Sequence, residues 1–212
     1  MTGNIRWWWV RHAPTVAPAG TLNGRSDVAA DLSDAAAVAG LARSLPTGAV
    51  WLVSPLRRTV ATAEALLGAG AQAAGDPVAE ADLLEQDFGA WEGGGYDQMD
   101  DGFWDDPVSN RPPGGESFAE VTSRVGGAIG RWSDLSAGRD IVAVAHAGVV
   151  RAALALALGG RAGEALRFAI DPLSLTRLDR VAGGGAAEEA WGIVCVNRPP
   201  GAASGGGQNE NP

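Results

Sequence analysis

Short apolar runs alternate with longer stretches of mixed polarity along most of the chain, and each run stops at or near a polar residue. Runs of this length are typical of buried strands in a parallel sheet. The predicted strands are Ile5–Val10, Ala49–Val53, Val78–Leu84, Ile141–Ala145, Ser174–Val181 and Trp191–Val196. Their spacing favours an α/β fold, a three-layer sandwich in which helices flank a mostly parallel central sheet.

Capping and stop signals place helices between these strands. The predicted helices run from an N-cap at Ser33 to Leu45, from beyond Pro55 to about Leu67, from a capping box at Ser117 to Leu135, and from Gly148 to Leu158. The acidic stretch after Leu84 is predicted to be a long excursion from the layered fold.

The length of 212 residues suits one domain, so we assign residues 1–198 to a single domain and the glycine-rich residues 199–212 to a disordered tail. The stretch Val142–Leu158 approaches the length of a membrane span, but His146 and Arg151 lie inside it, and ionisable groups are costly in a bilayer. We see no targeting signal and expect a soluble, cytoplasmic protein. The oligomeric state stays open.

Composition excludes several kinds of chemistry. All 16 Lys+Arg residues are arginine, which rules out a Walker-type lysine loop and a Schiff-base lysine. One cysteine and two histidines cannot form a Cys/His zinc site or an iron–sulfur cluster. The formal net charge of −9 argues against a nucleic-acid partner. Residues 76–120 hold 13 Asp and Glu and a single arginine, Arg111, so this segment carries the acidic excess.

The two histidines occupy equivalent positions, each directly after a buried apolar strand. His12 follows Arg11 after the first strand, and His146 follows the strand Ile141–Ala145. In α/β folds the carboxyl ends of parallel strands face a common cleft. One interpretation is that both histidines are structural and cap the strand ends, and the other is that they are functional. Arg58 favours the functional one, because it lies just beyond the second strand and would bring a guanidinium to the same rim. Two histidines and two arginines suit a site for a phosphoryl group.

Five separate motifs then identify a family. They are Val10–Thr15 with its Arg-His pair, Ser54–Arg58, Leu84–Gly93, Pro113–Phe118 and His146–Gly148. In this order and spacing they resemble the histidine phosphatase superfamily, which also contains the cofactor-dependent phosphoglycerate mutases. The resemblance implies a phosphoglycerate mutase-like fold and a phosphomonoesterase that uses no cofactor and no metal.

The same resemblance implies roles for individual residues. His12 would be the nucleophile that becomes phosphohistidine, Glu85 the general acid, and His146 a further catalytic residue. Arg11, Arg58 and His146 would hold the phosphoryl oxygens, with Ala147 beside them. Without its motif, Glu85 would be read as a solvated carboxylate.

The chain departs from the family pattern around the nucleophile. Ala13 replaces the usual glycine, Pro14 replaces an acidic or amide residue, and Pro18 stands where an asparagine is common. Thr15 and Asn23 are our candidates for the missing hydrogen bond to phosphate.

The acidic excursion has two interpretations. It is either a solvated loop or a specificity lid in which Tyr96, Phe103 and Trp104 contact the organic part of the substrate.

Three functions follow from these observations. A phosphatase acting on a small phosphomonoester is preferred, and the stretch from Arg111 to Ser117 resembles members that include alpha-ribazole phosphatases. A mutase is less favoured because the segment that would bind a second phosphate is acidic. A phospho-ligand-binding module without turnover is the third, although a binder has no need for a general acid.

Overall fold

The computed structural model describes residues 4–99, 101–136, 138–181 and 190–201. Within them lies one mixed sheet in the order β3-β2-β4-β1-β5-β6. Its strands are β1 (Ile5–Arg11), β2 (Val50–Val53), β3 (Val78–Ala79), β4 (Ile141–Ala145), β5 (Leu175–Val181) and β6 (Ala190–Arg198). Strands β1 to β4 run parallel, and β5 pairs antiparallel with both β1 and β6. This confirms the predicted α/β fold with its mostly parallel sheet.

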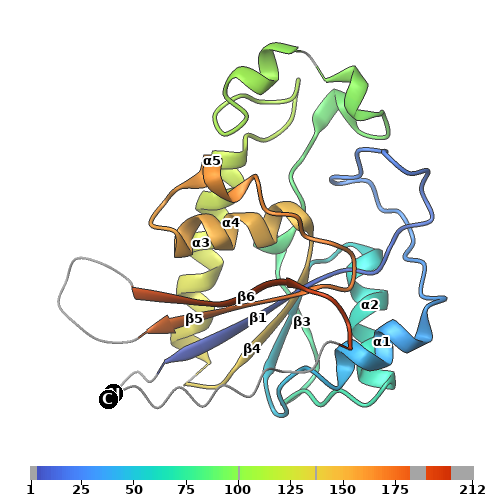
Figure 1. Ribbon diagram of the computed structural model, residues 1–212, viewed down its shortest axis with the longest axis vertical. Coiled ribbons are helices and arrows are strands. Elements are labelled where there is room, and N and C mark those ends of the chain that lie inside the picture. Colours follow the sequence, from blue (N-terminus) through green and yellow to red (C-terminus); the bar gives the residue numbers. More distant parts are fainter. Residues whose placement is uncertain (1–3, 100, 137, 182–189, 202–212) are drawn as a thin grey trace.

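Helices cover both faces of the sheet and complete the three layers (Figure 1). One face packs against α3 (Phe118–Leu135), α4 (Ala147–Ala157) and the short α5 (Ala162–Ala165), and the other against α1 (Ala35–Ala42) and α2 (Arg57–Gly68). Four short 3₁₀ helices follow β3, at Ala81–Leu83, Gly89–Trp91, Tyr96–Gln98 and Asp101–Asp105. The last three belong to the excursion, which extends from the layers at the top of Figure 1.

Strand β1 shows how alternation fills both cores. Trp7 and Trp9 are fully buried on one face and stack with ring centroids 5.0 Å apart. Trp8 points to the opposite face, where the guanidinium of Arg177 lies 4.8 Å from its ring. The tryptophan run is therefore packing, as its alternation indicates.

Two helix predictions are wrong in detail. Asp34, not Ser33, caps α1, because its carboxylate accepts a hydrogen bond from the amide of Ala37 at 2.9 Å. The helix ends at Ala42 rather than Leu45, and its last turn tightens through i→i−3 bonds such as that from the Leu45 amide to the Ala42 carbonyl. The capping box of Ser117 with Glu120 is confirmed.

The predicted strand Val78–Leu84 is also corrected, because pairing with β2 ends at Ala79. Glu80 accepts a hydrogen bond from the amide of Asp82, which starts a 3₁₀ helix in place of further strand. Cys195 is half-buried, because β6 forms an edge of the sheet.

The apolar stretch at Val142–Leu158 consists of β4 and the 11-residue helix α4. In the described part of the chain, no helix combines the length and apolar character that crossing a bilayer requires. The tail assigned to residues 199–212 lies, from residue 202 onward, outside the described residues.

Candidate active site

Strand register brings the two histidines together. In the parallel pair of β1 and β4, Arg11 lies opposite Ala145, and the amide of His12 donates to the carbonyl of Ala145 at 2.9 Å. The rings of His12 and His146 meet edge to face with centroids 5.1 Å apart. The site therefore lies at the carboxyl ends of adjacent strands, as predicted.

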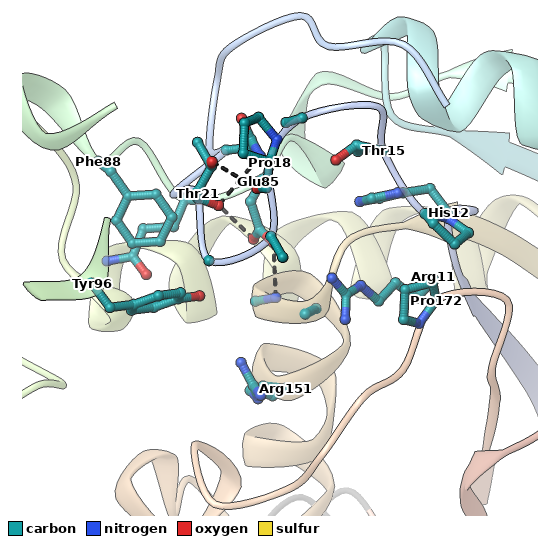
Figure 2. A pocket seen from close by; sticks show the side chains of 18 of the residues that line it. Arg11, His12, Thr15, Pro18, Thr21, Glu85, Phe88, Tyr96, Arg151 and Pro172 are labelled. Carbon is teal, nitrogen blue, oxygen red and sulfur yellow. Dashed lines mark hydrogen bonds between the residues drawn. The ribbon is translucent and has the colours of Figure 1, made fainter. Parts of the chain in front are cut away.

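A cavity of about 430 Å³ opens at this edge of the sheet. Figure 2 shows Arg11 and His12 on one side of it, Phe88 and Tyr96 on the other, and Arg151 along a third wall. Its lining comprises Arg11, His12, Pro14, Thr15, Ala17, Pro18, Ala19, Gly20, Thr21, Asn23, Glu85, Gln86, Phe88, Tyr96, Phe118, Ala147, Gly148, Arg151, Leu166 and Pro172.

His12 is held as a neutral ring. Its Nδ1 lies 2.6 Å from the carbonyl oxygen of Ala13, and since a carbonyl only accepts, Nδ1 carries the proton. The pKa of His12 is lowered to about 3, mainly by burial; the hydrogen bond to the Ala13 carbonyl opposes this effect, and the charges of Arg58 and Arg11 add to it. At neutral pH, Nε2 therefore carries a free electron pair.

His146 is a neutral ring as well, and it is completely buried. The guanidinium of Arg58 donates from Nε to Nδ1 of His146 at 3.3 Å, so the ring proton sits on Nε2. That Nε2–H donates to the hydroxyl of Ser54 at 2.8 Å. Burial, with the adjacent His12, holds the pKa of His146 well below its ordinary value. Ser54, the first residue of the motif Ser54–Arg58, thus orients this ring.

Arg58 lies behind the cavity lining rather than at its rim. It has no exposed surface, and its terminal nitrogens donate to the carbonyls of Asn23, Gly24 and Ser26. The structure therefore does not bring Arg58 and His146 to the cavity surface with Arg11 and His12. The ring of His146 packs against that of His12, and Arg58 is hydrogen-bonded to His146.

Arg11 is the guanidinium that faces the cavity beside His12 (Figure 2). One terminal nitrogen donates to the carbonyl of Ile170, and the backbone carbonyl of Arg11 accepts from the amide of Leu173 at 3.1 Å. Leu173 has a φ of 56°, an unfavourable value for a branched side chain. The segment that contains this strained residue therefore holds both the side chain and the backbone of Arg11 in place through hydrogen bonds.

Glu85 faces the cavity across from Arg11 and is tied to the start of α4. Its Oε2 accepts from the amide of Gly148 at 3.1 Å, and its Oε1 accepts from the amide of Gln86 at 3.0 Å. A Cβ on residue 148 would lie 2.3 Å from Oε1, so a larger residue there would displace the carboxylate from this position. Carboxylate, guanidinium and imidazole thus share one cavity.

A second carboxylate, that of Glu92, does not belong to the cavity lining. It accepts hydrogen bonds from the amides of Gly24, Arg25 and Ser26, from the Ser26 hydroxyl and from the amide of Phe88. Burial raises its pKa, but these bonds outweigh burial and the net pKa is lowered. Glu92 is therefore an ionised anchor for the loop on which Arg58 rests.

The remaining predicted residues divide into two groups. Thr15, Asn23, Ala147 and Tyr96 line the cavity. Phe103 packs instead into a small cluster with Leu22 and Met99, and Trp104 is half exposed, so neither contacts the cavity. Of the three aromatic residues expected to form a lid over the substrate, only Tyr96 therefore lines the cavity.

Sequence reasoning missed Arg151 and Phe88 as cavity residues. A signal for Arg151 was present, because it lies four residues after Ala147 and so on the same helix face. Phe88 also had a signal, because it lies within the motif Leu84–Gly93. Among the described residues, no group of three His, Cys, Asp or Glu side chains is placed to hold a metal ion.

Comparison with known proteins agrees with this geometry. Residues 7–193 match the family model described as the histidine phosphatase superfamily (branch 1). A bifunctional protein of Mycobacterium tuberculosis is 35% identical over 129 residues, and the match spans 58% of this chain but 35% of that protein.

Solved structures agree as well. An alpha-ribazole phosphatase from Shigella flexneri has a TM-score of 0.75 and 23% identity, covering 91% of this chain and 96% of that one. A mycobacterial glucosyl-3-phosphoglycerate phosphatase has a TM-score of 0.79 and 22% identity, covering 92% of this chain and 99% of that one. At these identities the two structures establish the fold.

Proposed function

The chain belongs to the histidine phosphatase superfamily, branch 1, and from this premise we propose that it hydrolyses small phosphomonoesters through a phosphohistidine on His12. The observation that carries the proposal is the state of the His12 ring. Its proton is held on Nδ1 by the Ala13 carbonyl, which leaves Nε2 as a nucleophile beside the guanidinium of Arg11.

In the first half-reaction, Nε2 of His12 attacks phosphorus in line with the leaving oxygen. The bond from nitrogen to phosphorus forms while the bond from phosphorus to the leaving oxygen breaks. Glu85, protonated before the step, gives its proton to that oxygen so that it departs as an alcohol.

In the second half-reaction, water attacks the phosphohistidine. Glu85, now a carboxylate, takes the proton from the water, and the bond between His12 and phosphorus breaks. Inorganic phosphate leaves and Glu85 is protonated again, so both groups return to their starting states.

Fixed donors stabilise the charge on the transferring group. We assign Arg11 to the phosphoryl oxygens, together with Ala147 at the positive N-terminal end of α4. Thr15 and Asn23, which line the same cavity, supply further hydrogen bonds. Arg58 and His146 act from behind His12, where the Arg58 charge favours the dianionic phosphoryl group on the ring.

Water is the proposed acceptor rather than a second substrate. The single arginine of the acidic segment, Arg111, is exposed and ion-paired with Glu120, and it does not belong to the cavity lining. The resemblance of the segment from Arg111 to Ser117 makes alpha-ribazole phosphate a candidate substrate for a first screen.

The proposal is tested by trapping the covalent intermediate. Wild type and His12→Ala are mixed briefly with ³²P-labelled 4-nitrophenyl phosphate and quenched in alkali, where phosphohistidine survives. We expect an acid-labile protein label in wild type and none in His12→Ala, with Arg167→Gln, an exposed surface change, as the matched control. Label that persists in His12→Ala contradicts the nucleophile. Binding of inorganic phosphate without turnover of any phosphomonoester in a panel indicates a binding module.

A further inference from the structure

Arg151 is a cavity residue to which none of the reaction steps assigns a role. It lies on α4, four residues after Ala147 and three after Gly148, and all three line the cavity. These spacings put them on one face of the helix, with Arg151 about one turn, roughly 5–6 Å, farther along the axis. Figure 2 shows its side chain directed into the cavity on a different wall from His12.

The guanidinium of Arg151 is oriented but not neutralised. Its Nε donates to the carbonyl of Phe168 at 2.9 Å, which holds the plane of the group. Across the residues that the structure describes, it forms no ion pair, and its two terminal nitrogens make no hydrogen bond. Those two nitrogens form the end of a rigid fork that matches the two oxygens of a carboxylate.

The charges in the cavity are unbalanced toward the positive. Arg11 and Arg151 both line it, while Glu85 is the sole carboxylate among its lining residues. Burial lowers the pKa of Arg11 most; the charge of Glu85 raises it and that of Arg151 lowers it again, so the two guanidinia repel each other within the cavity. A single phosphoryl group bound beside His12 would pair with Arg11. Arg151, one helical turn beyond Ala147, would then have no anion to pair with.

We propose that Arg151 binds a second anionic group carried by the alcohol part of the phosphomonoester. This inference rests on the proposed function and narrows its substrate class to phosphomonoesters with a further carboxylate or phosphate a few bonds from the ester oxygen. Phe88 and Tyr96, on the wall opposite Arg11 and His12, would contact the carbon skeleton of the alcohol part.

The test uses binding rather than turnover, so that it is independent of catalysis. The probes are non-hydrolysable phosphonates in matched pairs, 3-phosphonopropionate with its carboxamide and 4-phosphonobutyrate with its carboxamide. A corresponding bisphosphonate distinguishes a second phosphate from a carboxylate. Dissociation constants are measured by titration calorimetry for wild type, Arg151→Gln and the control Arg167→Gln, which removes an exposed charge on a neighbouring segment.

We expect wild type to bind at least one carboxylate about tenfold or more tightly than its amide, the size of a charge-assisted hydrogen bond. Arg151→Gln should lose this preference while binding the amide as wild type does, and Arg167→Gln should keep it. Equal affinity of wild type for every carboxylate and its amide, with no tighter binding of the bisphosphonate than of the amides, overturns the proposal, and this measurement needs no variant. A preference that survives in Arg151→Gln overturns it as well.

Failure of the proposed function gives a different result. A carboxylate preference that depends on Arg151, in a protein that neither turns over phosphomonoesters nor forms phosphohistidine, refutes the hydrolase and leaves the anion subsite standing. Turnover through His12 without a preference for either the carboxylates or the bisphosphonate over the amides refutes the subsite alone.

Discussion

Replacing Glu85 by glutamine tests the proposed general acid through the leaving group. A general acid lowers the barrier only as far as the departing oxygen needs a proton. An alkyl phosphate leaves as a strongly basic alkoxide, whereas 4-nitrophenyl phosphate leaves as a stable phenolate. Loss of the acid should therefore slow the alkyl substrate far more than the aryl one.

The structure sets two magnitudes for this change. Positioned proton transfer is worth about 100- to 10,000-fold, which is the expected loss in kcat/KM for the alkyl substrate. The unfolding free energy falls as well, because both carboxylate oxygens of Glu85 accept hydrogen bonds from backbone amides, those of Gln86 and Gly148. A glutamine amide turns an NH₂ group toward one of these donors, which costs about 1–3 kcal/mol of unfolding free energy. The loss of stability affects the assays with both substrates equally. The ratio of the two kcat/KM values therefore reports only the loss of the general acid.

The assay is kcat/KM for glycerol 1-phosphate and 4-nitrophenyl phosphate, because this quantity reports the steps up to the first irreversible one. Asp87→Asn is the matched control, since Asp87 lies two residues away, caps the amide of Gly89 and does not line the cavity. Equal slowing of both substrates would mean that Glu85 positions phosphate or water. No slowing of either would mean that another group is the acid.

Three further outcomes are expected. Activity should survive exhaustive chelation, because Arg11 supplies the positive charge that a metal would otherwise provide; activity that is lost and then restored by Mg²⁺ or Mn²⁺ contradicts this. Glu92→Gln should lower the unfolding free energy by about 2–4 kcal/mol in urea titrations, since the loop amides it binds lose an ionised acceptor, and an unchanged midpoint contradicts its anchoring role. His12 should make stability depend on pH: its folded pKa of about 3 lies below the unfolded value near 6.5. The unfolded state therefore takes up the proton first, and stability present above pH 6.5 is lost as pH falls toward 3, by about 1.4 kcal/mol per unit. In His12→Gln the unfolding free energy should change with pH between 6.5 and 5 by about 1.4 kcal/mol per unit less than in wild type. The same pH dependence in both proteins would show that His12 is not buried as a neutral ring.

Local patterns were sufficient for most of the fold. Capping at Ser117, the apolar run Ile141–Ala145 and the helix after His146 each depend on neighbours within a few residues, and each was predicted close to its observed bounds. The errors arose where a nearby side chain competed for a backbone group. Asp34 took the cap expected of Ser33, and Glu80 ended the strand expected to reach Leu84.

For the site, the sequence alone determined which chemistry was available and at which edge of the sheet it would gather. With two histidines, each after a buried strand, and no lysine, the chain predicts a phosphoryl site at the strand ends, and the parallel register of β1 and β4 brings His12 beside His146. Tertiary structure decided how each group is used, because proton positions and burial depend on partners distant in sequence. The ring of His146 takes its tautomer from Arg58, 88 residues away, and Ser54, 92 residues away. The spacing of Arg151 from Ala147 predicts that both lie on one face of α4, but only the packing of α4 decides that this face lines the cavity.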